Sequence, residues 1–257
     1  MSLNIGQALE DGVGQSTTRV ALSFVAIMTV LQALASVSAS TYLARMMQGR
    51  DLPQGMSVAD LTSAPVLPIG LGGVAVLYLL LAVAFAFVYI ALFRAFVGDA
   101  DALTGDLFTR RALGAFGHYV LLGIAYFVVA LVNVVPVLGQ IVFFFLITAL
   151  WFAPLRVAAE DDGALTALKR SWSITSGNRL RLFGLGAIYA IAAGVINLIA
   201  GTVFGFVPYV GFLLTAVVSS YLVVLGVAAT VAAYDQLEGE DEDDAGSVTP
   251  QPTAAGS

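Results

Sequence analysis

Long apolar stretches alternate with short polar segments along most of this chain. Four stretches contain no Asp, Glu, Lys or Arg, and they cover residues 20–44, 61–93, 112–155 and 182–234. A bilayer core requires about 20 consecutive apolar residues for each helix that crosses it. The first two stretches can therefore form one span each, and the last two are long enough for two spans each. The pattern predicts an all-α fold, a polytopic membrane helical bundle with six transmembrane helices.

The predicted organisation is one transmembrane domain over residues 1–237, followed by a polar tail. The expected spans are residues 20–43, 70–93, 113–134, 138–157, 181–205 and 210–234. The tail, residues 238–257, begins with a run of Glu and Asp and continues with mostly Ser, Thr, Pro, Ala and Gly. This composition favours a disordered acidic tail.

Both long stretches are interrupted by the same motif, Val-Pro-x-x-Gly. The first copy contains Pro136 and Gly139, and the second contains Pro208 and Gly211. Proline cannot donate the helical hydrogen bond, and glycine tolerates the left-handed backbone conformation that often ends a helix. Each motif is therefore expected to be a tight turn that ends one span and begins the next.

The spacing of the two motifs indicates an internal repeat. Their prolines are 72 residues apart, as are their glycines, and Gly105 precedes Gly177 by the same distance. Each unit is expected to contain a polar helix on the cytoplasmic side, a span, the turn and a returning span. Residues 3–19 and the first two spans are interpreted as a degenerate third copy. Three helical hairpins, each preceded by an interfacial helix, would then form the protein.

Composition restricts the function classes. Hydrophobic residues make up 59% of the chain, charged residues 11%, and the mean hydropathy is +0.93, which excludes a soluble globular protein. The chain has no cysteine and a single histidine, His118, so disulfides, zinc–thiolate sites, iron–sulfur clusters and thiol catalysis are excluded. It also has no nucleotide-binding glycine motif. We expect no enzyme activity, no cofactor, no metal site and no nucleic-acid partner.

Ten of the eleven basic residues are Arg, and Lys169 is the only lysine. Together with the acidic tail and a pI near 4.6, this bias favours a salt-loving host, in which dense carboxylates keep the protein surface hydrated. The alternative is GC-rich codon usage combined with an ordinary acidic tail.

Basic residues are distributed unequally between the loops. With six spans, the loops on the side of the N-terminus contain nine basic residues: Arg19, Arg94, Arg110, Arg111, Arg156, Lys169, Arg170, Arg179 and Arg181. The loops on the opposite side contain only Arg45 and Arg50. The positive-inside rule therefore predicts a multi-pass protein of the cell membrane with both termini in the cytoplasm.

The segment 161–173 is expected to form an amphipathic helix at the level of the lipid headgroups. Its two initial aspartates suit the positive end of a helix dipole, and Leu165, Leu168 and Trp172 share one face. The candidate interface with lipid or a partner consists of Lys169, Arg170, Trp172, Arg179 and Arg181. The alternative interpretation is an ordinary topology anchor, since basic residues are common beside spans. The expected partners are membrane lipids and an unidentified protein.

The fifth span carries small or polar residues at four-residue spacing, Ala193, Asn197, Gly201 and Gly205. Small residues on one stripe allow another helix to approach closely. The stripe is therefore a candidate packing surface, either within the chain or between two copies of it. Asn197 is expected to form an interhelical hydrogen bond.

No Asp, Glu, Lys or Arg lies deep within a predicted span, which argues against an ion-coupled pump because such pumps neutralise their ions with buried charges. The favoured hypothesis is a non-enzymatic membrane protein that organises lipids or partner proteins. The alternative is a facilitator or permease for a small neutral or lipid-like substrate, motivated by the helix breaks, Asn133 and Asn197.

The stretch 167–185, AlaLeuLysArgSerTrpSerIleThrSerGlyAsnArgLeuArgLeuPheGlyLeu, and the Val-Pro-x-x-Gly turn after it resemble a group of uncharacterised prokaryotic membrane proteins. That group is similar to the membrane domain attached to some glycerophosphodiester phosphodiesterases. Its haloarchaeal members look like six-span proteins with acidic tails. The resemblance is best over residues 97–237 and implies a layout rather than a chemistry, because the phosphodiesterase barrel and its metal site have no counterpart in this sequence.

Overall fold

The computed structural model describes residues 3–50, 57, 61–62, 64–207 and 210–246. Within these residues all regular elements are helical, and six helical segments are long and apolar enough to cross a membrane. The predicted all-α polytopic bundle is confirmed. The helices are α1 (Ile5–Ser16), α2 (Arg19–Met47), α4 (Leu71–Val97), α5 (Asp106–Thr109), α6 (Ala112–Leu131), the 3-10 turn η1 (Val132–Val134), α7 (Leu138–Ala149), α8 (Ala153–Ala159), α9 (Ala164–Ile174), α10 (Arg179–Gly205) and α11 (Gly211–Gly246).

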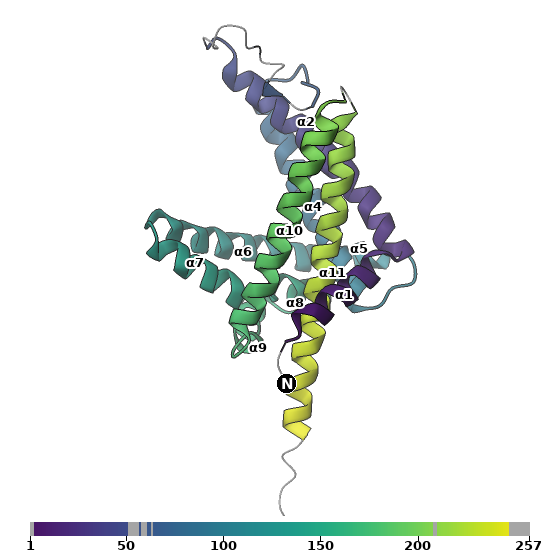
Figure 1. Cartoon of the computed structure of the whole chain (residues 1–257), viewed down its shortest axis with the longest axis vertical. Helices are drawn as coiled ribbons and strands as arrows, with labels where there is room; N and C mark the ends of the chain where they lie inside the picture. Colours follow the sequence, from purple (N-terminus) through teal and green to yellow (C-terminus); the bar gives the residue numbers. More distant parts are fainter. Residues whose placement is uncertain (1–2, 51–56, 58–60, 63, 208–209, 247–257) are drawn as a thin grey trace, which may run out of the picture.

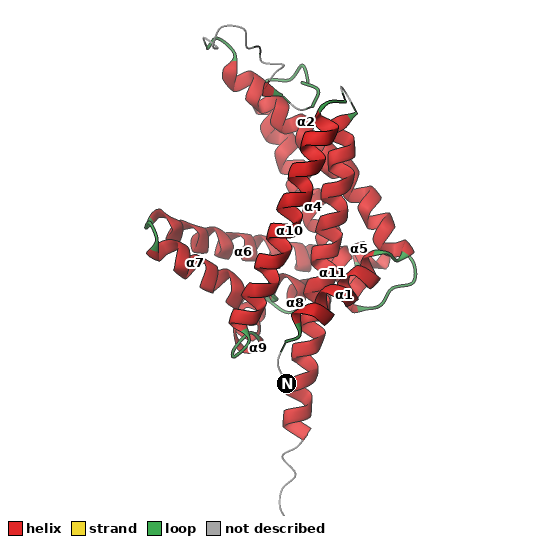
Figure 2. Ribbon diagram, in the orientation of Figure 1, coloured by secondary structure: helices red, strands yellow, loops and turns green. Residues whose placement is uncertain are grey.

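The helices form two groups that differ in direction. Figure 1 shows α2, α4, α10 and α11 running roughly along the long axis of the molecule, whereas α6 and α7 form a hairpin that projects sideways. Figure 2 shows that the molecule consists of helices joined by loops. The α6 side of this hairpin is mostly uncovered by the rest of the chain, since only 11% of the most hydrophobic part of Ala112–Val134 is buried.

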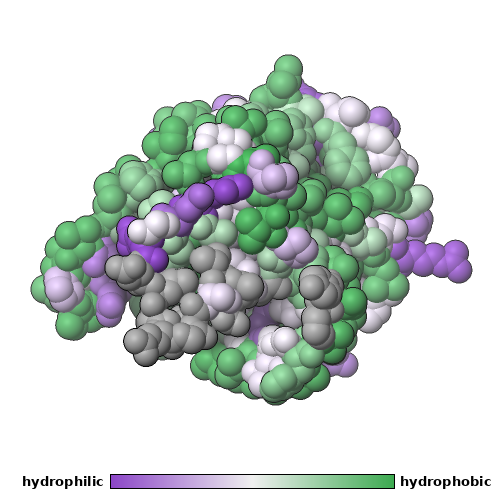
Figure 3. Space-filling view, turned by 90° about the horizontal axis from the view of Figure 1, so that it is seen from above, coloured by the Kyte–Doolittle hydropathy of each residue, from purple (hydrophilic) through white to green (hydrophobic). Residues whose placement is uncertain are grey.

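The main core lies where α1, α2, α4, α8 and α11 meet. Its largest fully buried side chains include Phe24, Met28, Phe152 and Tyr234, and the rings of Phe152 and Tyr234 meet edge to face at 5.3 Å. The helix α1 packs closely on α11, because a Cβ atom at Gly12 would lie 2.8 Å from the backbone of Ala229. Seen from above, most of the outer surface is hydrophobic (Figure 3), as expected for helices that face lipid.

The span predicted over 138–157 corresponds to one of the six candidate spans, Leu138–Ala159, but its helix is interrupted between α7 and α8. Pro154 lies in the first turn of α8 and lacks the amide that would donate to the carbonyl of Leu150. That carbonyl accepts instead from the hydroxyl of Tyr126, at 2.7 Å, and from the amide of Ala153, at 3.1 Å. The proline thus ends one helical ladder, and a tyrosine of α6 satisfies the carbonyl it leaves open.

Two hydroxyl groups of α9 stabilise the same break. The hydroxyl of Ser171 accepts from the amide of Phe152, at 3.1 Å, and donates to the carbonyl of Ala149, at 3.0 Å. Thr175 donates to that carbonyl as well, at 3.2 Å. The polar helix α9 is therefore not only a surface element, because it completes the backbone hydrogen bonding of the preceding span.

The predicted disordered tail begins too early. The helix α11 continues through residues 238–246, and residues 247–257 lie outside the described residues. The segment contains Glu, Asp, Ala and Gly but no proline before residue 250, and Glu238 is anchored by a contact with Tyr234 one turn earlier. Continued helical hydrogen bonding and this anchor extend the helix beyond the last apolar residue.

The two Val-Pro-x-x-Gly turns have the same backbone contacts. The chain turns at Pro136, between η1 and α7, and a Cβ atom at Gly139 would lie 2.0 Å from the carbonyl oxygen of Val132. A Cβ atom at Gly211 would likewise lie 2.0 Å from the carbonyl oxygen of Phe204. Each glycine amide donates to the carbonyl four residues earlier at 2.9 Å. Both positions therefore exclude any side chain. Pro208 lies outside the described residues.

Candidate functional site: an arginine and carboxylate cluster

Three consecutive carboxylates, Glu160, Asp161 and Asp162, connect α8 to α9 and lie at the centre of a charged cluster. They face arginines that come from α4, from the start of α6, from α8 and from α9. The cluster lies where the sideways hairpin joins the rest of the molecule (Figure 1). It divides into two parts, one around Arg156 and one around Asp161.

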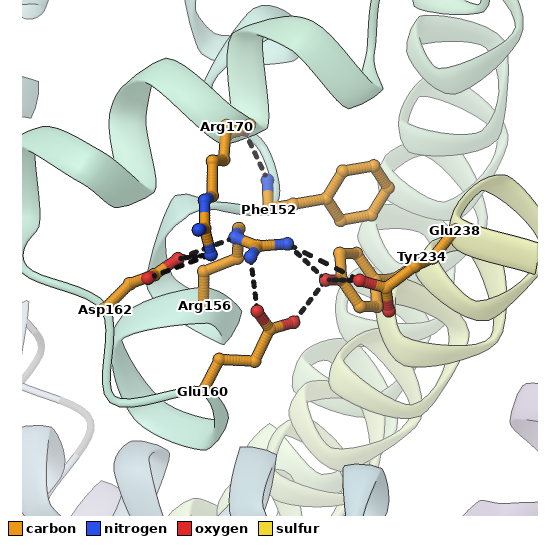
Figure 4. Close-up of polar contacts among 8 residues, drawn as sticks. Phe152, Arg156, Glu160, Asp162, Arg170, Tyr234 and Glu238 are labelled. Carbon is orange, nitrogen blue, oxygen red and sulfur yellow. Dashed lines mark hydrogen bonds and ion pairs between the residues drawn. The ribbon is translucent and has the colours of Figure 1, made fainter. Parts of the chain in front are cut away.

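Arg156 on α8 occupies the first part, shown in Figure 4. Its side chain is only 5% exposed, and its Nε lies 2.9 Å from Oδ2 of Asp162. It also forms an ion pair with Glu160 one turn later and donates to the hydroxyl of Tyr234 on α11. A charge this deeply buried requires such partners, because removal from water costs several kcal/mol for each ion, roughly.

The hydroxyl of Tyr234 connects this part to the end of α11. It contacts Glu160 and lies 2.8 Å from the carboxylate of Glu238. The guanidinium of Arg170 on α9 shares Asp162 with Arg156, at 3.2 Å, but its side chain is 56% exposed. Helices α8, α9 and α11 are thus joined through a single buried arginine.

Arg94, near the end of α4, is the buried arginine of the second part. Its Nε donates to the carbonyl of Ala158 at 2.7 Å, and its Nη1 donates to the carbonyl of Leu107 at 3.1 Å. Its Nη2 lies 3.6 Å from Asp161 and has no hydrogen-bond partner in the described part of the chain. Arg94 therefore holds α4, α5 and α8 together mainly through backbone carbonyls.

Asp161 receives three arginines. Besides Arg94, the side chains of Arg110 and Arg111 approach its Oδ2 at 3.7 Å and 3.9 Å. Arg110 also donates to the carbonyl of Ala159 at 3.0 Å. The two aspartates expected to cap the helix at 161–173 have a different role. The N-cap of α9 is Gly163, without a side-chain capping bond, because both carboxylates are bound by arginines instead.

The predicted interface residues do not form one surface. Arg179 stacks on the ring of Trp172, at 4.2 Å, and on that of Phe145, at 4.8 Å, and its Nη2 donates to the Trp172 carbonyl. Lys169 and Arg181 are exposed, whereas Arg170 turns toward Asp162. The structure therefore brings Trp172 and Arg179 together and assigns Arg170 to the buried cluster.

The helix α9 buries its small residues rather than its large ones. Ala164, Ala167 and Ser171 are buried, whereas Leu165 is 75% and Trp172 is 42% exposed. Leu168 packs on the small apolar cluster that contains Val157 and Ala164. The exposed leucine and tryptophan are therefore available to an apolar environment outside the chain.

The small-residue stripe of α10 is open. Apart from the adjacent turns of α10 itself, no atom of the described residues lies within 4 Å of a Cβ atom placed on Gly201 or Gly205, so close packing of another helix at these glycines is not observed. Asn197 does bridge two helices, because its Oδ1 accepts from the hydroxyl of Ser219 on α11, at 2.6 Å. Close approaches occur elsewhere, at Gly186 against Trp151 and at Gly226 against Tyr189.

Comparison with known proteins gives one family. A family described as a domain of unknown function, DUF7847, matches residues 3–237. The chain belongs to this family. Curated proteins and solved structures gave no significant match. The family match agrees with the resemblance to an uncharacterised family. The matched region of this DUF7847 member includes the arginines of the cluster and Glu160, Asp161 and Asp162, and it ends one residue before Glu238.

Sequence reasoning on this DUF7847 member missed its buried arginines. Arg94 and Arg156 were treated only as loop charges that set orientation, although both are at least 94% buried. A local signal existed, because Arg156 precedes Glu160 by one helical turn and is followed by two further acids. Tyr234 gave no such signal, since it lies 78 residues from Arg156 along the chain. Within the described residues no three His, Asp or Glu side chains are arranged to hold a metal ion.

Proposed function

We propose that this protein is a non-enzymatic integral membrane protein that organises lipids or a protein partner at the end of the bundle that carries α9. The supporting observation is the composition of the exposed side of α9 and the start of α10. Leu165 is exposed, and Trp172, whose ring packs on Phe145 and Arg179, is partly exposed. The cations Lys169 and Arg181, which are near them in the sequence, are exposed as well. Apolar side chains flanked by basic residues suit the boundary between acyl chains and anionic headgroups.

Several finer statements belong to the same proposal. We place the protein in the cell membrane of a haloarchaeal host, with both termini in the cytoplasm, on the basis of the unequal loop charges and the lysine-poor, acidic composition. The hairpins α6–α7 and α10–α11 are copies of one unit, in our interpretation. Their glycine turns support this, since Gly139 and Gly211 have the same carbonyl contact. The polar helix that precedes the hairpin α6–α7 is α5, which has only a single turn.

The test uses the full chain in vesicles of phosphatidylglycerol or of phosphatidylcholine. The variant Lys169→Gln/Arg181→Gln removes the two exposed cations, and Arg50→Gln/Arg19→Gln removes two exposed cations elsewhere. The first variant should retain several-fold less phosphatidylglycerol on extraction, since each basic residue near an anionic surface contributes about 1 kcal/mol. Equal retention by both variants, at unchanged topology, would remove the basis of the proposal.

A facilitator for a small neutral or lipid-like substrate is the second candidate. It is supported by a cavity of about 310 Å³ between α4, α10 and α11. The lining is mainly apolar and includes Tyr89, Trp151 and Tyr189. A volume of this size is at the lower end of those that hold small ligands.

Flux measurements on reconstituted vesicles distinguish the two candidates. Val223 lines the cavity, so Val223→Phe should block transport, whereas Val217→Phe places the same side chain at an exposed position of α11. If wild-type vesicles show no flux for a broad panel of metabolites and labelled lipids, the facilitator hypothesis is rejected.

A further inference from the structure

A second cavity of about 310 Å³ lies beside the charged cluster, where α6 begins. Its lining combines the first residues of α6 with the segment between α8 and α9: Arg111, Gly114, Ala115, His118, Val157, Asp161 and Asp162. The α6 side includes a cation, an imidazole and a glycine without a side chain. The cavity is thus polar and has space for a ligand group next to the arginines.

The electrostatic environment of this cavity is positive. Around Asp161, three guanidinium groups lie within 4 Å of one carboxylate, those of Arg94, Arg110 and Arg111. The neighbouring Asp162 is already bound by Arg156 and Arg170. The lining itself carries Arg111 with Asp161 and Asp162, but across the whole cluster five guanidinium groups face four carboxylates. One positive charge is therefore left over, and the low dielectric around buried groups strengthens its attraction for an anion.

Two buried polar atoms of this region lack hydrogen bonds within the described residues. One is Nδ1 of His118, which lines the cavity. The other is Nη2 of Arg94, which lies outside the lining and faces Asp161 at 3.6 Å. Leaving a buried polar group unsatisfied costs about 1–3 kcal/mol, so such groups usually have a partner outside the protein. The oxygens of an anionic group can accept hydrogen bonds from guanidinium and imidazole donors.

Two large apolar side chains are exposed in the first turns of α6 and α9, the helices that begin close to lining residues in the sequence. Leu113 is 83% and Leu165 is 75% exposed, and each lies one residue from the start of α6 or α9 in the sequence near the cavity lining. Exposed leucines close in the sequence to a polar pocket match a ligand that has an anionic head and an apolar body. A small soluble anion would not make use of these side chains.

We propose that this cavity binds the phosphate headgroup of an anionic membrane lipid, with Arg111 and His118 facing the phosphate and Leu113 and Leu165 contacting the acyl chains. The inference rests on the proposed lipid-organising function and assigns to it a specific lipid class and a specific site. The binding residues differ from the exposed cations Lys169 and Arg181. An experiment can therefore reject lipid binding in this cavity without rejecting the proposed lipid-organising function.

Native mass spectrometry of the full chain in detergent tests the site, with phosphatidylglycerol as the probe and a neutral glycolipid as the phosphate-free control. Gly114→Phe fills the cavity, and no atom of the described residues lies within 4 Å of a Cβ atom at this position. Gly123→Phe is its matched control, because Gly123 is equally open and lies nine residues further, on the opposite face of α6. Arg111→Gln removes the cation at the cavity, and Arg19→Gln removes an exposed one elsewhere.

We expect Gly114→Phe and Arg111→Gln to reduce the affinity for phosphatidylglycerol by about tenfold or more, which corresponds to the loss of one charge-assisted hydrogen bond. The two controls should bind as the wild type does, and the glycolipid should not be retained. Loss of binding only in Lys169→Gln/Arg181→Gln would reject the cavity but support the proposed function. No retained lipid in the wild type would reject both. Full displacement of the lipid by inorganic phosphate would overturn the lipid as the ligand.

Discussion

Arg111 and Asp161 form an ion pair in which both residues have a left-handed backbone. Their φ angles are 46° and 55°, and Nη1 of Arg111 lies 3.9 Å from Oδ2 of Asp161. Such conformations cost roughly 1–3 kcal/mol for a residue other than glycine, and they persist where the surroundings hold them. Here the two strained residues are on either side of the proposed headgroup cavity. We interpret the strain as part of the arrangement that directs Arg111 toward Asp161.

The first prediction separates backbone strain from charge. Arg111→Gly should raise the free energy of unfolding by up to about 1 kcal/mol, because glycine adopts positive φ without strain and an exposed ion pair contributes little. Arg110→Gly is the control for loss of an exposed arginine beside Asp161, since its φ is −57° and glycine there relieves no strain. It also removes the hydrogen bond to the Ala159 carbonyl, so it should destabilise the protein. Thermal unfolding in detergent measures both. A loss of stability in Arg111→Gly equal to that in Arg110→Gly would show that no strain is stored at Arg111.

The second prediction compares two arginines on one carboxylate. Arg156→Gln should destabilise the protein by about 3–5 kcal/mol, because it leaves Glu160 and Asp162 without their buried counter-charge. Arg170→Gln removes the exposed partner of the same Asp162 and should cost less than about 1 kcal/mol. Unfolding midpoints and the yield of folded protein report the difference. Similar losses in the two variants would contradict the central role of Arg156.

The third prediction concerns the glycines of the two turns. Gly139→Ala and Gly211→Ala should each destabilise the fold by more than about 3 kcal/mol, because the new methyl group would lie 2.0 Å from a backbone carbonyl oxygen. Gly201→Ala and Gly205→Ala provide controls in open helical positions. They should be neutral or stabilise by up to about 1 kcal/mol through helix propensity. A strong loss in the controls would instead reveal a packed partner on α10.

The fourth prediction tests the support that α9 gives to the broken span. Ser171→Ala leaves the buried amide of Phe152 without its acceptor and should cost about 1–3 kcal/mol. Ser173→Ala changes the same side chain on the exposed side of α9 and should cost less than about 0.5 kcal/mol. Circular dichroism during heating measures both variants. Equal stability of the two would mean that the amide finds another partner.

The fifth prediction addresses topology and uses the absence of cysteine from the sequence. Single substitutions Gln48→Cys and Val135→Cys should react with an impermeant maleimide added outside intact cells. Ser173→Cys should react only after permeabilisation, because it belongs to the arginine-rich side. The cysteine-free wild type controls for background labelling. Reaction of Val135→Cys only from the inside would show that the hairpin α6–α7 does not cross the membrane.

The span pattern was predictable because it depends on local composition. A helix in hydrocarbon must satisfy its backbone internally and must be long enough to cross. Charge-free stretches between polar segments therefore define α2, α4, α6, α10 and the start of α11 with errors of a few residues. The turn at Pro136 depends on similarly local chemistry. Local composition also misled in two places, since it implied one continuous helix over 138–157 and a disordered segment directly after residue 237.

The sequence by itself determined the fold class, the six apolar helices and the absence of cysteine chemistry, because each follows from residue types within a short window. The tertiary structure alone decided which polar residues meet. Arg156 and Tyr234 are 78 residues apart, and Arg94 reaches Ala158 over 64 residues. Pairing over such distances depends on how helices pack. The local sequence pattern therefore does not show that Arg94 and Arg156 are buried at the centre of a charged cluster.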